Sequence, residues 1–331
     1  MTAVLAKSDF VRAPLLAADA PDYKEWHHFV VHAPGSPVLI NVSLTGDRAA
    51  RIIVIAHDRR WTGVVERFDP SQLAVSADLG ELTLGASSMR VTPDGYRVRV
   101  DLPHRGIRGE VEFTSVSRPF VVNNQPVGEG RMSWLFVPRL RAAGWLHING
   151  HDIVFDDEQA YHDHNWGRFR WGGDFGWTWG TIVAEERDNP WSLVFLQMTD
   201  RRRLRSTAQA VYVWHRDEPA AMLLRSAVHT SVHGTLHRAA DCTLPAPMAL
   251  IVDGAVPGVP ERLEISAERL GDTVHAEFRP TSYARLAHPS EVHLDRCTVL
   301  CEAGGRAHVT GEIRGERIDF DGAALFEFLH G

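Results

Sequence analysis

Short stretches in which apolar and polar residues alternate recur along this chain, and they constrain its fold more than any other feature. In residues 96–102, Val98, Val100 and Leu102 alternate with charged side chains. An extended segment of this kind has one apolar and one polar face. The preceding Pro93-Asp94-Gly95 is typical of a turn, because proline fixes φ and glycine tolerates positive φ. The pattern therefore predicts two strands joined by a tight turn.

Similar segments occur throughout the chain, while the 3.6-residue period of long helices is nearly absent. Only short pieces such as residues 70–73 favour a turn of helix. Many short strands at roughly even spacing are typical of β-sandwiches and β-barrels, so we predict an all-β protein. The main expected strands are residues 38–44, 51–56, 73–77, 82–84, 90–92, 96–102, 109–115, 191–198, 208–214, 222–224, 263–267, 273–278, 291–295 and 307–313.

The length of 331 residues favours two packed β-units over one very large sheet. The polar run Glu185–Pro190 ends in proline and is the best candidate for a boundary. We therefore expect domains at residues 1–187 and 188–331.

Composition excludes several classes of protein. The net charge is −7 and the basic residues are scattered, which does not fit a nucleic-acid partner. Three cysteines are too few and odd in number for a disulfide scaffold. Residues 1–20 lack the unbroken apolar stretch of a signal peptide. No segment reaches the roughly 18 apolar residues of a membrane span. We expect a cytoplasmic protein without stable membrane insertion; the oligomeric state stays open.

The densest functional candidate is Tyr161-His-Asp-His-Asn-Trp-Gly167, followed closely by Trp171-Gly-Gly-Asp-Phe-Gly-Trp-Thr-Trp-Gly180. Side chains alternate between the two faces of a strand. If both segments are extended, each face can be assigned from the sequence. One face of the first segment carries Tyr161, Asp163 and Asn165, and the other carries His162, His164 and Trp166. In the second segment, Trp171, Phe175, Trp177 and Trp179 share a face and form an aromatic wall.

Asp163 is the expected proton donor. A carboxyl group that faces apolar surroundings loses solvation in its charged form, so its pKa rises and it can act as a general acid. Aromatic ring faces stabilise a positive charge by roughly 0.5–2 kcal/mol each. An acid beside such rings suits protonation of an alkene and stabilisation of the resulting carbocation. The alternative is a structural role, in which Asp163 binds backbone amides or an arginine and the tryptophans are core residues.

His162 and His164 raise the question of a metal ion, since two histidines separated by one residue on a strand can reach the same ion. Such a site needs a nearby carboxylate, and Arg168 and Arg170 stand there instead. We therefore expect no metal ion. One histidine would orient Asp163 or a neighbouring strand through its ring nitrogens.

Three motifs together resemble the carotenoid 1,2-hydratase (hydroxyneurosporene synthase) family: the segment 161–167, the upstream Ser133-Trp-Leu-Phe-Val-Pro-Arg139, and the closing Gly322–Gly331. The resemblance covers essentially the whole chain in motif order. It implies two tandem lipocalin-like β-barrel domains and a reaction without cofactor. It also implies that Asp163 is the proton donor, and that Trp134 and Trp166 lie nearby. The wider group contains hydratases, terpenoid cyclases and pericyclases.

The leading hypothesis is thus an acid-catalysed hydratase or cyclase for an apolar isoprenoid alkene. The expected catalytic residues are Asp163, Tyr161 and His164. The expected substrate-binding residues are Trp134, Asn165, Trp166, Trp171, Phe175, Trp177 and Trp179. Two alternatives remain open: a pericyclase that shapes a polyene, and a lipocalin-like protein that binds an apolar metabolite without converting it.

Overall fold

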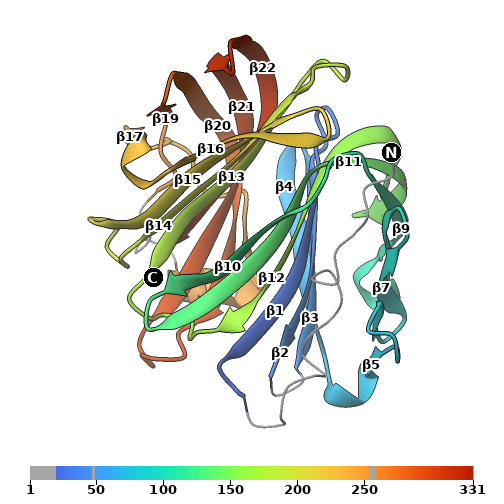
Figure 1. The fold of residues 1–331 in the computed structure, drawn as a ribbon. Helices are drawn as coiled ribbons and strands as arrows, with labels where there is room; N and C mark the ends of the chain where they lie inside the picture. Colours follow the sequence, from blue (N-terminus) through green and yellow to red (C-terminus); the bar gives the residue numbers. More distant parts are fainter. Residues whose placement is uncertain (1–19, 47–48, 253–257, 331) are drawn as a thin grey trace. The chain divides into compact units, whose positions relative to one another are not determined.

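Strands account for nearly all of the regular structure in the computed structural model of the chain (Figure 1). The structure describes residues 20–46, 49–252 and 258–330. These residues form two compact units. Unit 1 comprises the described residues up to Arg59 together with Gly63–Phe169, and unit 2 comprises Arg60–Thr62 together with the described residues from Arg170 onward.

The first sheet contains 12 strands in the described part of the chain, in the order β4-β3-β2-β1-β12-β11-β9-β8-β7-β6-β5, with β10 paired to β11. The long strand β12 therefore lies between β1 and β11, and it is antiparallel to both. The strands are β1 (Tyr23–Val31), β2 (Val38–Thr45), β3 (Ala50–Asp58), β4 (Arg60–Phe68), β5 (Leu73–Val75), β6 (Glu81–Leu84), β7 (Ser87–Thr92), β8 (Gly95–Leu102), β9 (Ile107–Ser115), β10 (Phe120–Val127), β11 (Gly130–Ile148) and β12 (His151–Arg168).

Alternation along these strands builds the core of unit 1. Val98 and Val100 of β8 are buried in the same hydrophobic core as Phe29, Leu135 and Val137. The predicted turn before β8 is confirmed, and Gly95 is required there for a steric reason. A Cβ atom at this position would lie 1.8 Å from the carbonyl oxygen of Phe113 on the neighbouring strand. The local pattern thus sets both the strand and its close approach to β9.

The second sheet contains 10 strands among the described residues, in the order β16-β15-β14-β13-β22-β21-β20-β19-β17, with β18 paired to β20. One face packs into a separate core that includes Phe195, Phe278 and Phe326. The strands are β13 (Gly176–Ala184), β14 (Trp191–Thr199), β15 (Ser206–His215), β16 (Glu218–Leu224), β17 (Val228–His233), β18 (Cys242–Leu244), β19 (Arg262–Arg269), β20 (Asp272–Pro289), β21 (Cys297–Ile313) and β22 (Glu316–His330).

Helix is limited to single turns in the part of the chain that is described. The turn expected near residues 70–73 is present as η3. The full set is η3 (Pro70–Gln72), η4 (Pro103–Arg105), η5 (Arg225–Ala227), η6 (Ala246–Met248) and α1 (Ala249–Val252). The predicted all-β class with very little helix is confirmed.

One predicted strand is wrong. Residues 291–295 form part of the turn between β20 and β21. Ser290 explains this turn, because its Oγ accepts hydrogen bonds from the backbone N–H groups of Val292 (3.1 Å) and His293 (2.9 Å). Such local bonds compete with pairing in a sheet. Leu294, which the alternation placed on a strand face, is fully exposed.

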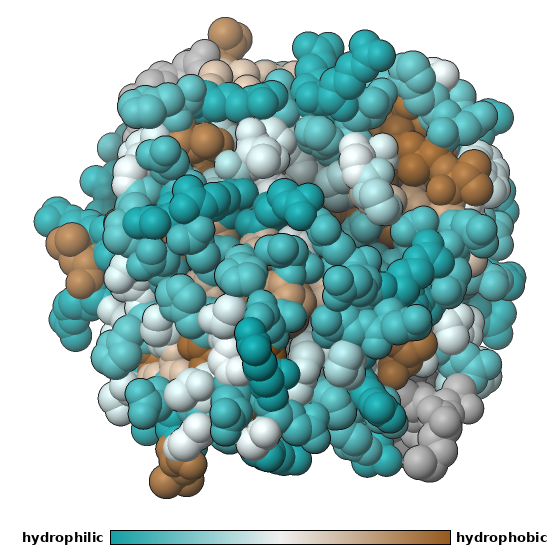
Figure 2. Space-filling view, turned by 90° about the horizontal axis from the view of Figure 1, so that it is seen from above, coloured by the Kyte–Doolittle hydropathy of each residue, from teal (hydrophilic) through white to brown (hydrophobic). Residues whose placement is uncertain are grey.

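The surface face in Figure 2 is mostly hydrophilic, with hydrophobic residues in separate spots. Among the described residues, no helix is both long and apolar enough to cross a membrane. The expected absence of a signal peptide concerns residues 1–19, which lie outside the described part, so the cytoplasmic location stays a prediction.

The expected domain boundary at residues 187/188 falls in the turn after β13. The two compact units of the structure instead divide after Phe169, so that β13 belongs to unit 2. The division into domains at residues 187/188 stays a prediction.

Candidate functional site

The segment 161–167 lies in β12, the strand flanked by β1 and β11. Asp163 pairs with His28 of β1 and with Phe136 of β11. Because directly paired residues point to the same side of an antiparallel sheet, the alternation along β12 assigns its neighbours as well. The structure thus has the two faces that the sequence indicated. The face that carries Asp163 is called the aspartate face below, and the opposite one, which carries His162 and His164, the histidine face.

The aspartate face holds a compact hydrogen-bonded group. The Tyr161 hydroxyl donates to Oδ2 of Asp163 at 2.9 Å, and the Asn165 side-chain amide donates to Oδ1 of Asp163. Asp163 is only 5% exposed, and Tyr161 is fully buried. A hydroxyl both donates and accepts, so a protonated Asp163 can instead donate to the Tyr161 oxygen through the same contact. The group therefore suits either protonation state of the carboxyl.

Aromatic and neutral side chains flank Asp163 on this face. Phe136, directly opposite on β11, stacks on Trp134 with ring centroids 4.5 Å apart and an interplanar angle of 26°. His28 is opposite on β1, and burial lowers its pKa to about 3, so its ring is neutral at pH 7. The expected substrate-binding residues Trp134 and Asn165 are thus brought together with Asp163, pairing with each other across β11 and β12.

The histidine face points into the core of unit 1, and it holds His164 and Trp166 away from Asp163. Nε2 of His164 lies 2.9 Å from Oε1 of Glu25, and both side chains are buried. The Trp166 ring packs beside His164, with centroids 4.9 Å apart. His164 was expected to be catalytic and Trp166 to bind substrate, and both lie on the face opposite Asp163, as the alternation along 161–167 indicated.

Three histidine rings stack along this face. His27 of β1 lies between His164, at a centroid distance of 3.9 Å, and His162, at 5.4 Å. His162 places Nδ1 3.1 Å from the His28 carbonyl oxygen. Burial, reinforced by the neighbouring histidines, lowers the pKa of both His27 and His162 well below the ordinary value.

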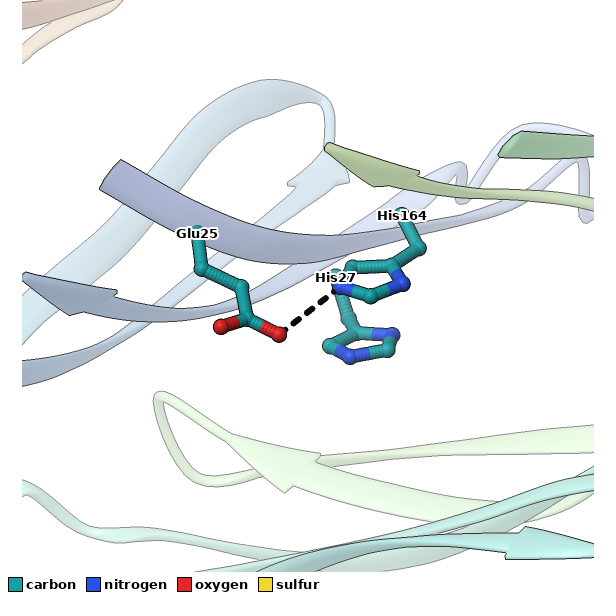
Figure 3. A group of neighbouring side chains, drawn as sticks. All are labelled: Glu25, His27 and His164. Carbon is teal, nitrogen blue, oxygen red and sulfur yellow. Dashed lines mark hydrogen bonds and ion pairs between the residues drawn. The ribbon is translucent and has the colours of Figure 1, made fainter. Parts of the chain in front are cut away.

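Among the described residues, Glu25, His27 and His164 form a group that could hold a metal ion (Figure 3). Their ligand atoms all lie within 4.8 Å of one another. From the sequence, the candidate ligands were His162 and His164, and no carboxylate stands in the positions that follow them. The carboxylate comes from β1, where Glu25 immediately precedes Trp26-His27-His28, so only the strand pairing could reveal it.

The expected aromatic wall lies in unit 2 and is only partly a strand. Residues 171–173 form a turn, and β13 begins at Gly176. Gly172 explains the break, since its φ is +84° and a Cβ atom there would lie 2.0 Å from Oγ of Ser290. The expected single extended face from Trp171 to Trp179 is therefore wrong. Three aromatic residues still cluster, because Trp177 has its ring centroid 5.8 Å from those of both Trp171 and Phe175.

Sequence reasoning missed a pair of buried carboxyl groups in unit 2. Glu302 of β21 pairs directly with Glu327 of β22, and the two are 1% and 9% exposed. Nε1 of Trp177 donates to Oε1 of Glu327, and Trp179 is directly opposite on β13. Burial raises the pKa of Glu327, against the opposing effect of hydrogen bonds with Glu302 and Trp177. One feature of the sequence could have revealed this pair, because Glu327 stands inside the otherwise apolar run 324–329.

A polar pocket of about 300 Å³ also belongs to unit 2. Two of its lining residues, Arg201 and Arg202, belong to the basic run 201–203 in the turn between β14 and β15. Arg203 instead turns inward and donates to the carbonyl oxygens of Trp177 (3.2 Å) and Leu329 (3.4 Å). The pocket is lined by Gly172, Gly173, Asp174, Asp200, Arg201, Arg202 and His293.

The fold and its two sheets define an all-β, lipocalin-like class of protein. Kievitone hydratase from Nectria haematococca has this fold: the TM-score is 0.62 at 12% identity, over 100% of this chain and 96% of the hydratase. A protein assigned as AttH from Nitrosomonas europaea gives 0.61 at 13%, over 98% of this chain and 96% of its own. CghA, solved with Sch210972, gives 0.59 at 13%, over 94% and 89%.

No protein-family model and no curated protein sequence matches the chain. At identities of 12–13% the structural likeness shows the fold alone. The resemblance to carotenoid hydratases is thereby supported at the level of the fold that the neighbours share.

Proposed function

We propose that this protein is an acid-catalysed hydratase or cyclase for an apolar, isoprenoid-type alkene, with Asp163 as the proton donor. The observation that carries the proposal is the buried Asp163 group, with Tyr161 and Asn165 on its oxygens and the Trp134–Phe136 stack beside it. It combines a carboxyl of restricted solvation with aromatic faces on one side of a sheet. The reaction needs no cofactor.

The proposed reaction begins when the Asp163 O–H bond breaks and its proton forms a C–H bond with the alkene π electrons. This leaves a carbocation on the substrate and a carboxylate on Asp163. The carboxylate is stabilised by the Tyr161 hydroxyl and the Asn165 amide. Aromatic ring faces stabilise the cation. Water, or a second double bond of the substrate, then supplies an electron pair to the cation. The proton lost afterwards returns to Asp163.

Support from the comparisons is limited to the class of reaction. The fold is shared with an enzyme named as a hydratase, and a second structure of the same fold contains a bound small molecule. Both fit a small-molecule substrate for this chain. The neutral ring of His28 beside Asp163 adds no cation that would favour a carboxylate.

The test is product analysis after incubation of the purified protein with a panel of terpenoid, carotenoid and polyene alkenes. The expected result is a hydrated or cyclised product that the Asp163→Asn variant does not form, although that variant still binds the substrate. Conversion by Asp163→Asn at the wild-type rate would contradict the acid role and favour a pericyclase that works through shape. Binding without any conversion by the wild type would favour a carrier of apolar metabolites.

A further inference from the structure

The histidine face carries a second constellation, separate from the Asp163 group. We propose that Glu25, His27 and His164 form a binding site for one divalent transition-metal ion of the zinc, cobalt or iron(II) type. This inference is independent of the proposed acid chemistry, because its ligands point to the other face of the sheet.

The placement of the three ligands follows from strand geometry. Glu25 and His27 are two residues apart on β1 and so share a face, and His164 is directly paired with His27 across β1 and β12. In Figure 3 the Glu25 carboxylate reaches toward the His164 ring, and the His27 ring lies alongside. The potential ligand atoms of all three residues fall within 4.8 Å of one another.

His27 gives an independent reason to expect a ligand. Its side chain is 1% exposed, and neither ring nitrogen has a hydrogen-bond partner among the described residues. Buried polar atoms are nearly always satisfied, and an orphan commonly marks an ion or water that completes the site. Nε2 of the neighbouring His162 is also without such a partner in the described part. The interior of unit 1 thus contains buried imidazole nitrogens of His27 and His162 whose hydrogen-bonding capacity is unused among the described residues, and a metal ion could accept a lone pair from one of them.

The donor set decides which ion fits. Two imidazoles and one carboxylate suit zinc, cobalt and iron(II), whereas magnesium and calcium prefer sites made of oxygen atoms. Metal–nitrogen and metal–oxygen bonds are about 2.0–2.2 Å long, so any ligand atoms near the upper limit of 4.8 Å must move closer together to share one ion. The His27 and His164 rings are stacked at an interplanar angle of 8°, so one ring must turn to make the lone pairs converge. His164 must also present Nε2 without its proton.

The Glu25 carboxylate is held by a hydrogen bond of the kind that usually orients metal ligands. The Tyr23 hydroxyl donates to Oε2 of Glu25 at 3.0 Å, which leaves Oε1 directed at His164. Hydrogen bonds of this kind orient ligands and tune the affinity of a site. Three protein ligands leave a position open on a four-coordinate ion, the arrangement of reactive metal centres.

The experiment is a titration of the chelator-treated, full-length protein with Co²⁺, followed by visible absorption and calorimetry. We expect one Co²⁺ per chain with a d–d absorption band, and affinity at least tenfold weaker in His27→Phe and in Glu25→Gln. The phenylalanine keeps the stacked ring, and the glutamine keeps the shape of the side chain. His32→Phe is the matched control, since His32 is a buried histidine just beyond β1 and outside the cluster; it should bind Co²⁺ as the wild type does.

The absence of Co²⁺ binding in the wild type, or equal binding in His27→Phe and His32→Phe, would overturn the proposal. Circular dichroism establishes whether each variant is folded. If a variant does not fold, anomalous diffraction from wild-type crystals soaked in Co²⁺ decides the question. A peak bounded by Glu25, His27 and His164 supports the site, and a peak elsewhere or none refutes it.

Discussion

Asp163 in unit 1 and Glu327 in unit 2 are both buried carboxyl groups, but their hydrogen-bond partners differ. Asp163 receives hydrogen bonds from Tyr161 and Asn165, both two residues away on its own strand. Glu327 instead meets Glu302 from the neighbouring strand and an indole N–H from Trp177. The first carboxyl accepts two hydrogen bonds from its own strand. The second faces another acid, and burial raises its pKa, which favours retention of a proton.

The two sites differ in how much of the chain is needed to assemble them. The Asp163 site is encoded within five consecutive residues, because alternation along a strand is enough to gather its members. The Glu302–Glu327 site requires β13, β21 and β22 to pair in register. A local site can be found by inspection of the sequence, whereas a site assembled across strands becomes visible only in the fold.

The largest expected effect is a difference in turnover between variants of Asp163 and of Glu327. In a product-forming assay, Asp163→Asn should lower turnover by about 10²–10⁴-fold, the usual contribution of general acid–base catalysis. Glu327→Gln should retain turnover within about tenfold of the wild type, on the order of 1.4 kcal/mol or less in activation free energy. Rate measurements on both variants with one substrate check this. The reverse order would make Glu327 the proton donor and refute the role proposed for Asp163.

A second difference should appear in the pH dependence of stability. The pKa of Glu327 is raised in the folded protein by burial, so the folded state keeps a proton that the unfolded chain loses near the ordinary value of 4.5. The stabilisation is complete below pH 4.5 and is lost as pH rises toward the folded pKa, at no more than about 1.4 kcal/mol per pH unit.

Urea unfolding of the wild type and of Glu327→Gln at pH 5, 6 and 7 measures this loss. The wild type should lose stability relative to the variant as pH rises, and the subtraction removes the contribution of the buried histidines common to both. A constant difference between the two proteins across this range would show that Glu327 is ionised in the folded state.

The smallest expected effect tests the state of Asp163 itself. Tyr161→Phe removes one hydrogen bond from a buried carboxyl, and a protonated, neutral Asp163 should make this cost about 0.5–1.5 kcal/mol of unfolding free energy. A carboxylate would make the loss about 1.5–3 kcal/mol, because charged acceptors form stronger bonds. Denaturant unfolding at pH 7 distinguishes the two ranges. A loss in the upper range would contradict the protonated acid that the proposed reaction requires.

Much of the fold could be predicted because alternation is a local property. The strand from residue 96 to 102, its turn, and the division of residues 161–167 into two faces are all confirmed. The two wrong predictions, the extended aromatic wall and the strand 291–295, have local physical causes that are not visible in the alternation of apolar and polar residues. The φ of +84° at Gly172 ends the wall before β13, and the Ser290 side chain converts residues 291–295 into a turn.

The candidate site was predictable in part. The alternation correctly placed Asp163, Tyr161 and Asn165 on one face and His164 and Trp166 on the other, which packs toward the core. The catalytic role expected for His164 and the substrate-binding role expected for Trp166 stay predictions. Glu25 escaped notice because no sequence spacing links it to His164; only the antiparallel pairing of β1 and β12 brings the two together.

Strand β12 carries the Asp163 group on one side and the histidine cluster on the other, so both share a single backbone. Insertion or deletion of one residue just before Tyr161 would exchange the faces, turning Asp163 toward the core of unit 1 and His162 and His164 to the side that Asp163 occupies. Neither group can therefore be repositioned along this strand without displacing the other. Any change in the chemistry of one face has to proceed by replacing side chains, with the length of the segment held constant.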